Sequence, residues 1–360
     1  MAEFNLSKAT TTDFTNQVPD FIMDAKALDV DNSDGETTYY FENAVTDLGY
    51  YKNDPIVFSA ANGLATWAFS LGWTAEDADT IQELKHITGR GNDTFSSVMW
   101  NHEVIKLIVG DAFMEIVWED NDNTKALANL VPISPERVRI ISKAGRILRY
   151  EVWTGKTPWK TVKTENMYHT SNKRIGDQIH GTSQLDAIRN TIDARQEAEA
   201  DERIIKHRDK ALGIVYYKTN NAGKIAYANT QIEKAVKNGE MVGMPEDTAK
   251  IEPYPSRSSE DRQNWISSRE NFCYATLGVP KTMITSDGTS ETGSINGHLI
   301  FEVTAGKEAS DEEDSIDSQM FRIVKFTRPP SLAPKVQENQ AANTGQTQIN
   351  PEEATPSVNR

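Results

Sequence analysis

The sequence holds one cysteine, Cys273, among its 360 residues. A single cysteine excludes a disulfide within the chain and a zinc site built from several cysteines. Because disulfides form in oxidising compartments, this usage favours a reducing cytosol. We expect Cys273 to be a buried structural residue, because it falls on the apolar side of a predicted helix, next to Phe272.

Long hydrophobic runs are missing as well. No apolar stretch approaches the roughly 20 residues that a membrane span needs, so the sequence predicts no membrane protein. The first eight residues lack a basic stretch followed by an apolar core, and we expect no secretory signal. With 38% hydrophobic and 25% charged residues, the chain is expected to be globular. Its length favours roughly two to three domains of about 150 residues each.

Positive charge is scarce. The chain has 38 Lys and Arg against 53 Asp and Glu, which gives a net charge of −15. A compact protein of this charge does not condense onto DNA or onto an anionic membrane. Double-stranded DNA can nevertheless pass such a surface without sticking to it.

The motifs of common catalytic sites are absent. The sequence has no P-loop, no complete G-x-G-x-x-G, no G-x-S-x-G elbow and no H-E-x-x-H helix. Two enzymatic alternatives stay open. Cys273 is a possible nucleophile if a distant histidine approaches it. His169 and His180 flank a basic loop and are possible metal ligands, although no third ligand occurs at a useful spacing. Packing roles fit all three side chains better.

Apolar periodicity divides the first half of the chain into helices and strands. Residues 1–45 are polar and predict an extended arm. Three helices are then predicted, over 55–69, 77–86 and 94–109. Alternating patterns follow and predict strands over 110–118, 137–142 and 147–153, the last two joined by a turn at 143–145. The region 110–170 is therefore expected to be a small antiparallel unit within an α+β fold.

A long helix is predicted over 182–210, because Gly181 precedes it, Ser183 and Asp186 give a capping signal, and neither Gly nor Pro interrupts it. Its apolar stripe is narrow, and most other positions are charged. Such a helix suits packing against a few neighbours in an assembly. We therefore expect Ile192→Asp or Ile205→Asp to weaken subunit association more than folding.

The second half of the chain predicts a small unit between two helices. Residues 211–255 indicate strand, helix and strand, the second strand at 240–244, and a further helix starts at Ser258 and ends at Gly278. The small, polar residues 286–298 are read either as a surface linker or as a moving element in a channel. A last helix is predicted over 299–326, and its acidic middle, 308–317, is expected to be a solvated face. The proline-rich composition after Thr327 predicts disorder over 327–360.

Three stretches in this order resemble the portal proteins of tailed double-stranded DNA viruses. The first runs from Leu130 to Ile140 and continues, after a glycine turn, into Arg149-Tyr-Glu-Val. The second joins Glu165-Asn-Met-Tyr-His169 to Ile179-His-Gly-Thr-Ser-Gln-Leu-Asp-Ala-Ile188, and the third is Asn271-Phe-Cys-Tyr-Ala-Thr-Leu-Gly-Val-Pro280. Each is weak alone, but together they span some 200 residues.

The resemblance implies a portal-like subunit and a division of the chain. The expected parts are an arm (1–45), an α/β wing (46–180), two long stem helices (181–210 and 256–279) bracketing a small αβ clip (211–255), a tunnel loop (280–298), a helix with a minimal crown (299–326) and a disordered tail (327–360). It also implies a ring, usually of twelve copies, at one capsid vertex of the virion. The expected partners are the large terminase, a head-completion or adaptor protein, the major capsid protein with or without scaffold, and DNA that passes without sequence readout. No cofactor and no metal are implied. The remaining alternative outside enzymes is another head–tail connector module.

The resemblance assigns site residues by position. For the DNA tunnel loop these are Lys281, Ser286, Asp287, Thr289, Ser290, Glu291, Ser294, Asn296 and His298. For the clip, as docking surface, they are Tyr217, Lys218, Lys224, Glu233, Lys237 and Glu240. For subunit contacts of the stem they are Leu185, Ile188, Ile192, Ile205 and Trp265.

Overall fold

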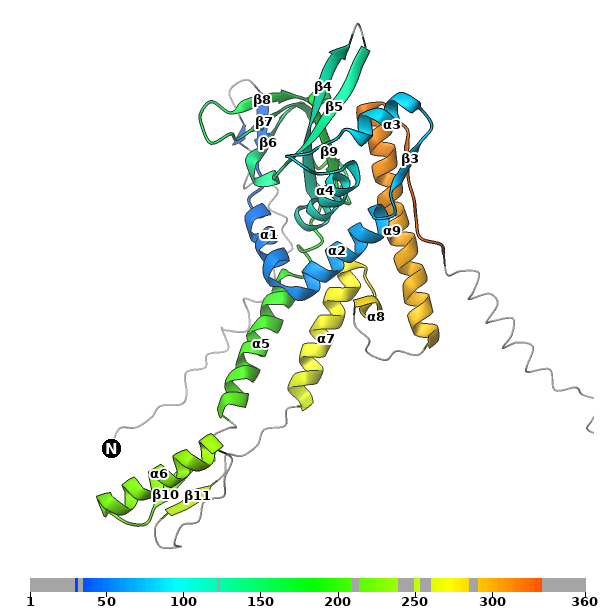
Figure 1. Cartoon of the computed structure of the whole chain (residues 1–360). Helices are drawn as coiled ribbons and strands as arrows, with labels where there is room; N and C mark the ends of the chain where they lie inside the picture. Colours follow the sequence, from blue (N-terminus) through cyan, green and yellow to red (C-terminus); the bar gives the residue numbers. More distant parts are fainter. Residues whose placement is uncertain are drawn as a thin grey trace, which may run out of the picture.

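The computed structural model describes residues 30–31, 35–121, 124–208, 214–238, 249–252, 260–284 and 291–331. In these ranges the chain forms a body of helices and sheets from which a leg of two helices projects (Figure 1). The α+β class expected from the sequence is confirmed. Among the described helices, none combines the length and the apolar character that crossing a membrane requires.

The helices of the body begin and end at residues suited to those positions. Asp54 caps α2 (Pro55–Phe69) by accepting hydrogen bonds from the amides of Ile56 and Val57, and Thr94 caps α4 (Phe95–Val109) in a capping box with Ser97. The other two helices of this part are α1 (Ala44–Asn53) and α3 (Ala78–Lys85). The helices predicted over 55–69, 77–86 and 94–109 are therefore confirmed.

Two antiparallel sheets cover the helices. One has the order β5-β4-β9, with β4 (Asp111–Asn121), β5 (Thr124–Ile133) and β9 (Met167–Ser171). The other has the order β1-β2-β6-β7-β8, with β1 (Val30–Asp31), β2 (Glu36–Tyr39), β6 (Val138–Lys143), β7 (Arg146–Val152) and β8 (Lys160–Lys163). The antiparallel unit expected over 110–170 is thus present. Short 3-10 turns, Pro135–Arg137 and Thr164–Asn166, join its strands.

The expected extended arm ends earlier than residue 45. Glu36–Tyr39 is a strand that pairs with β6, so that Thr38 faces Ile141. The carboxylate of Glu36 accepts two hydrogen bonds from Arg149, at 3.0 and 2.8 Å. These contacts with residues about a hundred positions away make the segment part of the body, and local composition does not reveal them. Residues 1–29 of the expected arm lie outside the described residues.

The leg consists of α5 (Arg189–Arg208), α7 (Glu260–Leu277) and a small unit at their far end (Figure 1). That unit contains β10 (Ile214–Tyr217), α6 (Ala222–Asn238) and β11 (Ala249–Glu252), and the two strands pair antiparallel. The order of strand, helix and strand agrees with the sequence prediction. The strand predicted at 240–244 lies outside the described residues, and the strand that pairs with β10 is at 249–252.

The last helix, predicted over 299–326, starts earlier and also ends earlier than the sequence predicts, because 324–326 is a strand. After α8 (Lys281–Ile284), α9 runs from Glu291 to Met320 and leads into β12 (Val324–Phe326), which pairs with β3 (Trp73–Ala75). The expected loop over 286–298 is therefore wrong for 291–298. Gly297 suggested a loop, but a Cβ there would lie 3.2 Å from Pro280, so the glycine allows close packing inside a helix. Of the tail expected over 327–360, residues 327–331 are described, and the amide of Thr327 donates to the carbonyl of Gly72 (2.9 Å).

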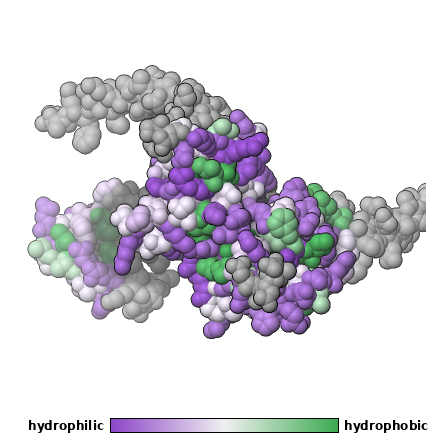
Figure 2. Space-filling model, turned by 90° about the horizontal axis from the view of Figure 1, so that it is seen from above, coloured by the Kyte–Doolittle hydropathy of each residue, from purple (hydrophilic) through white to green (hydrophobic). Residues whose placement is uncertain are grey.

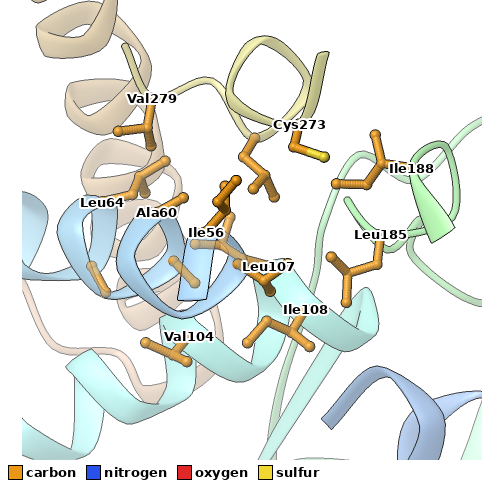
Figure 3. Close-up of a cluster of buried hydrophobic side chains, with 14 of the residues drawn as sticks. Ile56, Ala60, Leu64, Val104, Leu107, Ile108, Leu185, Ile188, Cys273 and Val279 are labelled. Carbon is orange, nitrogen blue, oxygen red and sulfur yellow. The ribbon is translucent and has the colours of Figure 1, made fainter. Parts of the chain in front are cut away.

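The largest apolar core lies where the body meets the leg (Figure 3). It joins α2 and α4 to the segment before α5 and to the end of α7. Leu185, Ile188, Ile192 and Cys273 are at most 2% exposed within it. The buried position predicted for Cys273 is confirmed. The long helix begins at Arg189 rather than at 182, because residues 184–188 form a turn whose amide at Gln184 donates to the carbonyl of Leu107 (3.1 Å).

Two glycines bring the leg against the body. Gly110 ends α4 at φ 95°, and the amide of Asn172 donates to its carbonyl (2.7 Å). A Cβ on Gly181 would lie 2.1 Å from that carbonyl oxygen, and a Cβ on Gly110 would lie 2.7 Å from the carbonyl oxygen of Gly181. The two backbones therefore touch at a point where no side chain fits.

We predict that Gly181→Ala lowers the free energy of unfolding by more than about 3 kcal/mol, because rigid backbone surrounds the added methyl group on two sides. The matched control is Gly63→Ala in α2, where nothing lies within 4 Å of the added Cβ and φ is not positive. That change should raise stability by about 0.5–1 kcal/mol. Chemical denaturation of both variants measures the difference, and equal effects would contradict this account of Gly181.

Candidate functional site

Beyond its root in the core, the leg projects from the body (Figure 1). Its helices α5 and α7 run antiparallel, and the guanidinium of Arg262 donates to Glu202 across them at 2.8 Å. Ile204, Trp265 and Phe272 are 66%, 39% and 56% exposed. The guanidinium carbon of Arg269 lies 4.8 Å from the ring centre of Trp265 and 6.0 Å from that of Phe272. The leg thus presents large apolar side chains beside charges, as surfaces that bind other proteins do.

Charged pairs fix the root of the leg. Arg189 donates two hydrogen bonds to the buried carboxylate of Asp47, each of 2.9 Å. One turn further along both helices, the hydroxyl of Tyr50 donates to Asp193 (2.7 Å), and this contact and burial raise the pKa of Tyr50 to about 12. The third contact joins Arg195 to Asp54, whose side chain is fully buried. Side chains of α1 and of the following residue therefore hold the first two turns of α5.

The residues predicted for stem contacts divide into two groups. Leu185, Ile188 and Ile192 pack inside the chain's own core, so their prediction as contacts between subunits is wrong, and Ile192→Asp is expected to impair folding itself. A narrow apolar stripe looks the same whether it faces another part of the chain or another copy, which is why the sequence did not separate them. Ile205 is half-buried and Trp265 is exposed. The roles of both residues in subunit contacts stay predictions.

The residues predicted for the clip lie in the small unit at the end of the leg. Tyr217 ends β10, and its hydroxyl is hydrogen-bonded to Asn229 of α6. Lys218, Lys224 and Glu233 are exposed. Lys237 belongs to α6, and Glu240 lies outside the described residues. Tyr216 and Tyr227 are 50% and 59% exposed and add aromatic surface that the prediction missed.

The residues predicted for the tunnel loop are only partly described. Ser286, Asp287, Thr289 and Ser290 lie outside the described residues. Glu291, Ser294, Asn296 and His298 belong to the first turns of α9, so they are helical rather than in a loop. Lys281 begins α8, and its ammonium lies 3.7 Å from Glu270. The imidazole of His298 lies 3.2 Å from Glu302. Carboxylates of the same chain therefore oppose both expected phosphate contacts.

The acidic middle of α9 is the predicted solvated face only at its aspartates, which are exposed, and not at its glutamates. Glu308 and Glu312 are buried, and their carboxylates lie 3.1 and 2.9 Å from the ammonium of Lys106 on α4. Glu103, one turn before Lys106, is 2.7 Å from the same ammonium. We call Glu103, Lys106, Glu308 and Glu312 the Lys106 cluster. A signal for it was present, because Glu103 and Lys106 interrupt the apolar side of a predicted helix.

The Lys106 cluster holds three carboxylates around one ammonium, and protonation of Glu103 removes part of this excess of negative charge. Burial raises the pKa of Glu103 to about 8. Glu312 also receives a hydrogen bond from Tyr168 (2.6 Å). Burial opposes its ionisation, but Lys106, His102 and Tyr168 hold its pKa below the usual value. The neighbouring His102 is fully buried, and its pKa falls to about 4, so it is neutral. The cluster therefore binds α9 to α4 through a charged Lys106 and an ionised Glu312.

The two histidines of the enzymatic alternative converge on Asp111. Its Oδ1 accepts from His169 (2.9 Å) and Ser171 (2.5 Å), and its Oδ2 accepts from His180 (3.2 Å) and the amide of Gly181 (3.0 Å). Burial opposes ionisation of Asp111, but the two histidines hold its pKa well below the usual range. These contacts attach the start of the leg to β4 and β9.

This arrangement does not support nucleophilic catalysis. Ser171 lies 3.2 Å from Nε2 of His169, the same nitrogen that contacts Asp111. A serine–histidine–aspartate relay needs the serine on one ring nitrogen and the carboxylate on the other. Within the described residues, no three His, Cys, Asp or Glu side chains are placed to hold a metal ion. Cys273 has no exposed surface, and burial raises the pKa of its thiol.

The described structure combines a body with buried charged contacts and a projecting leg of two helices (Figure 1). The model of the phage portal protein family matches residues 56–299, about two thirds of the chain. The chain therefore belongs to the phage portal protein family. No curated protein matches it.

Solved structures share the fold at low sequence identity. The neck of a native gene transfer agent particle, computed with C12 symmetry, is 13% identical, with a TM-score of 0.68, over 89% of this chain and 95% of that chain. The neck of an empty gene transfer agent particle, computed with C6 symmetry, is 13% identical, with a TM-score of 0.64, over 87% and 92%. The extent of both matches shows that the portal fold includes the body and the leg.

We predict that Glu103→Gln removes a decline of stability with pH. Between pH 4.5 and about 8 the folded chain holds a proton on Glu103 that the unfolded chain has released, so the free energy of unfolding falls as pH rises through this window. Glutamine is neutral in both states and abolishes this part of the decline. Denaturation at pH 5, 6, 7 and 8 measures it.

The matched control is Glu312→Gln. It removes an ionised partner of Lys106 and an acceptor of Tyr168, so it should lower stability at pH 7 by about 3–5 kcal/mol, as the loss of one partner of a buried pair does. If Glu103→Gln costs as much and keeps the wild-type slope with pH, Glu103 is ionised in the folded chain and the assignment is wrong.

Proposed function

We propose that this chain assembles into a ring of twelve copies at one vertex of a viral capsid and forms the conduit for DNA packaging and ejection. The observation that carries the proposal is the leg of α5 and α7, which exposes large apolar side chains outside the chain's own core. Membership of the phage portal protein family supports it. The C12 symmetry of the similar gene transfer agent neck supports twelve copies and a place in the virion.

Under this proposal the parts of the fold take the roles that the resemblance implies. The sheets with α1–α4 form the wing, α5 and α7 form the stem, β10, α6 and β11 form the clip, and α8 with the start of α9 borders the tunnel. The clip docks the large terminase and later a head-completion or adaptor protein. Its exposed Tyr216 and Tyr227 suit this role, because tyrosine is enriched at protein interfaces. The major capsid protein surrounds the ring, and scaffold is a further candidate partner.

DNA is proposed to pass the ring without sequence readout. The net charge of −15 opposes tight binding of phosphates. Lys281 and His298 carry the only basic side chains assigned to the tunnel, and each lies near a carboxylate of its own chain. Their contacts with DNA are therefore weak and exchangeable. In this arrangement the terminase supplies ATP hydrolysis and the ring supplies the passage.

The mass of the purified protein tests the ring directly. Light scattering and negative-stain images should show particles of about twelve 40.2 kDa subunits with a central hole. Because scaffold or capsid protein is able to drive assembly, a monomeric preparation is followed by co-expression with the capsid proteins of the same virus. A monomer in both preparations contradicts the proposal.

We predict that Ile204→Asp prevents ring assembly but leaves folding intact. Ile204 is 66% exposed on α5, so an aspartate there stays solvated within a single chain and costs no desolvation energy. Between subunits, the same aspartate would be an unpaired buried charge. The matched control is Ile192→Asp on the same helix, which is fully buried and should unfold the chain. Sizing and thermal unfolding of both variants measure the contrast. Normal rings with Ile204→Asp would exclude this part of α5 from the subunit interface.

A further inference from the structure

The chain that follows β12 runs back along α9. We call residues 327–331 the strap. Just before it, the amide of Phe326 donates to the carboxylate of Glu313 (2.9 Å). At its end, the hydroxyl of Ser331 donates to the carboxylate of Glu302 (2.6 Å). The second acceptor lies nearer the start of α9 than the first, so the strap and the helix are antiparallel.

Arg328 attaches the middle of the strap to the same helix. Its guanidinium donates to the hydroxyl of Ser310 (2.8 Å), and a Cβ added to Gly306 would lie 3.7 Å from its Nη1 atom. Pro329, the next residue, is half-buried. Small residues of α9 therefore leave room for the strap, which keeps one direction along the helix over its whole length.

The contacts at the two ends of the strap define its register. They span eleven residues of α9 and five residues of the chain that lies on it. Eleven helical residues rise roughly 16 Å, and five extended residues cover about the same length. One residue of the strap thus passes about two residues of the helix. At this rate Val336 reaches the first turn of α9, which begins at Glu291.

An apolar row lies on α9 just beyond the point where the strap ends. Val303, next to Glu302, is 74% exposed, and Leu299 is half-buried. Ile295 precedes Leu299 by four residues in the same helix. Residues four apart share one face of a helix. Seen from above, the molecular surface is largely hydrophilic, with hydrophobic groups gathered in a few places (Figure 2). An exposed apolar row is therefore a candidate contact surface.

We propose that the next five residues, 332–336, continue the strap along this apolar row to the start of α9. Their sequence is Leu332-Ala-Pro-Lys-Val336, in which Leu, Pro and Val alternate with Ala and Lys. Alternate residues of an extended chain point to one side, so this segment has an apolar side. At the register of the strap, Leu332 lies at the height of Leu299 and Val303.

The hydrogen bond between Ser331 and Glu302 selects the same chain as the partner. It fixes the residue before Leu332 within 2.6 Å of α9, one residue from Val303. The contact therefore needs no second copy, and the inference does not rest on the proposed ring. It makes residues 332–336 part of the fold and moves the start of the predicted disorder from 327 to 337. In the proposed ring, the tail would then cover the helix that borders the tunnel.

Engineered cysteines test the register in the full chain, whose own Cys273 is buried. One variant combines Val336→Cys with Thr292→Cys, in the first turn of α9. The matched control combines Val336→Cys with Lys307→Cys, an exposed position five residues beyond Glu302 in the other direction. A tail that is unattached after Ser331 reaches Lys307 at least as easily, because this position is nearer the point of attachment. We expect instead at least about tenfold more disulfide with Thr292→Cys.

Leu332→Asp shows whether the apolar row holds the segment. Moving a carboxylate onto an apolar surface is unfavourable, so the disulfide between positions 292 and 336 should fall about tenfold. The matched control is Ala333→Asp, which adds the same charge on the other side of the extended segment. It should leave the yield of the disulfide unchanged.

Three outcomes overturn the inference. An equal or higher yield with Lys307→Cys shows that the tail does not follow α9 beyond Ser331. An unchanged yield with Leu332→Asp removes the apolar row as the contact surface. A disulfide that forms only when two singly substituted copies are mixed assigns the segment to a neighbouring copy. Because each yield is measured within one chain, none of these results depends on whether rings form.

Discussion

The carboxylate of Asp54 is the point on which the arrangement of this subunit depends. One oxygen accepts hydrogen bonds from the amides of Ile56 and Val57 and so begins α2. The other binds Arg195 and Gln196 of α5. A single buried side chain therefore starts a core helix of the body and fixes the direction of the leg. Losing it would leave the guanidinium of Arg195, which is 2% exposed, without its buried partner.

Buried polar contacts of this kind specify geometry more than they add stability. Desolvation offsets much of the attraction within a buried ion pair. Three such centres nevertheless surround the junction of body and leg: Asp54 with Arg195, Asp111 with the two histidines, and the Lys106 cluster. Each joins elements that are far apart in the sequence, and an alternative packing would leave a charge unpaired. A ring of identical subunits needs this property, because a small error in the angle of the leg is repeated at every interface.

The sequence predicted helices and strands well, because their patterns are local. It predicted contacts between distant parts of the chain poorly, because a single sequence carries no local signal for them. Gly278 marks a helix end by local chemistry, and the alternation at 137–142 gives a strand directly. Ile192 was assigned to a subunit interface because its stripe is narrow, but it is fully buried in the chain's own core. Gly297 suggested a loop because its packing partner, Pro280, is not visible in a single sequence. The family-like order of motifs carried the functional prediction, and side-chain patterns alone did not reach it.

The glutamates and aspartates of α9 differ in burial, and this difference bears on the proposed channel. Glu308, Glu312 and Glu313 are buried, where their longer side chains reach Lys106, Lys325 and the amide of Phe326. Asp311, Asp314 and Asp317 recur every three residues and are exposed. The buried glutamates stabilise the fold, and Lys106 and Lys325 balance part of their charge, so they contribute little to the field outside the subunit. The exposed aspartates give α9 its acidic outer face. Any repulsion of DNA by this helix must therefore come from the aspartates, and net charge alone overstates it.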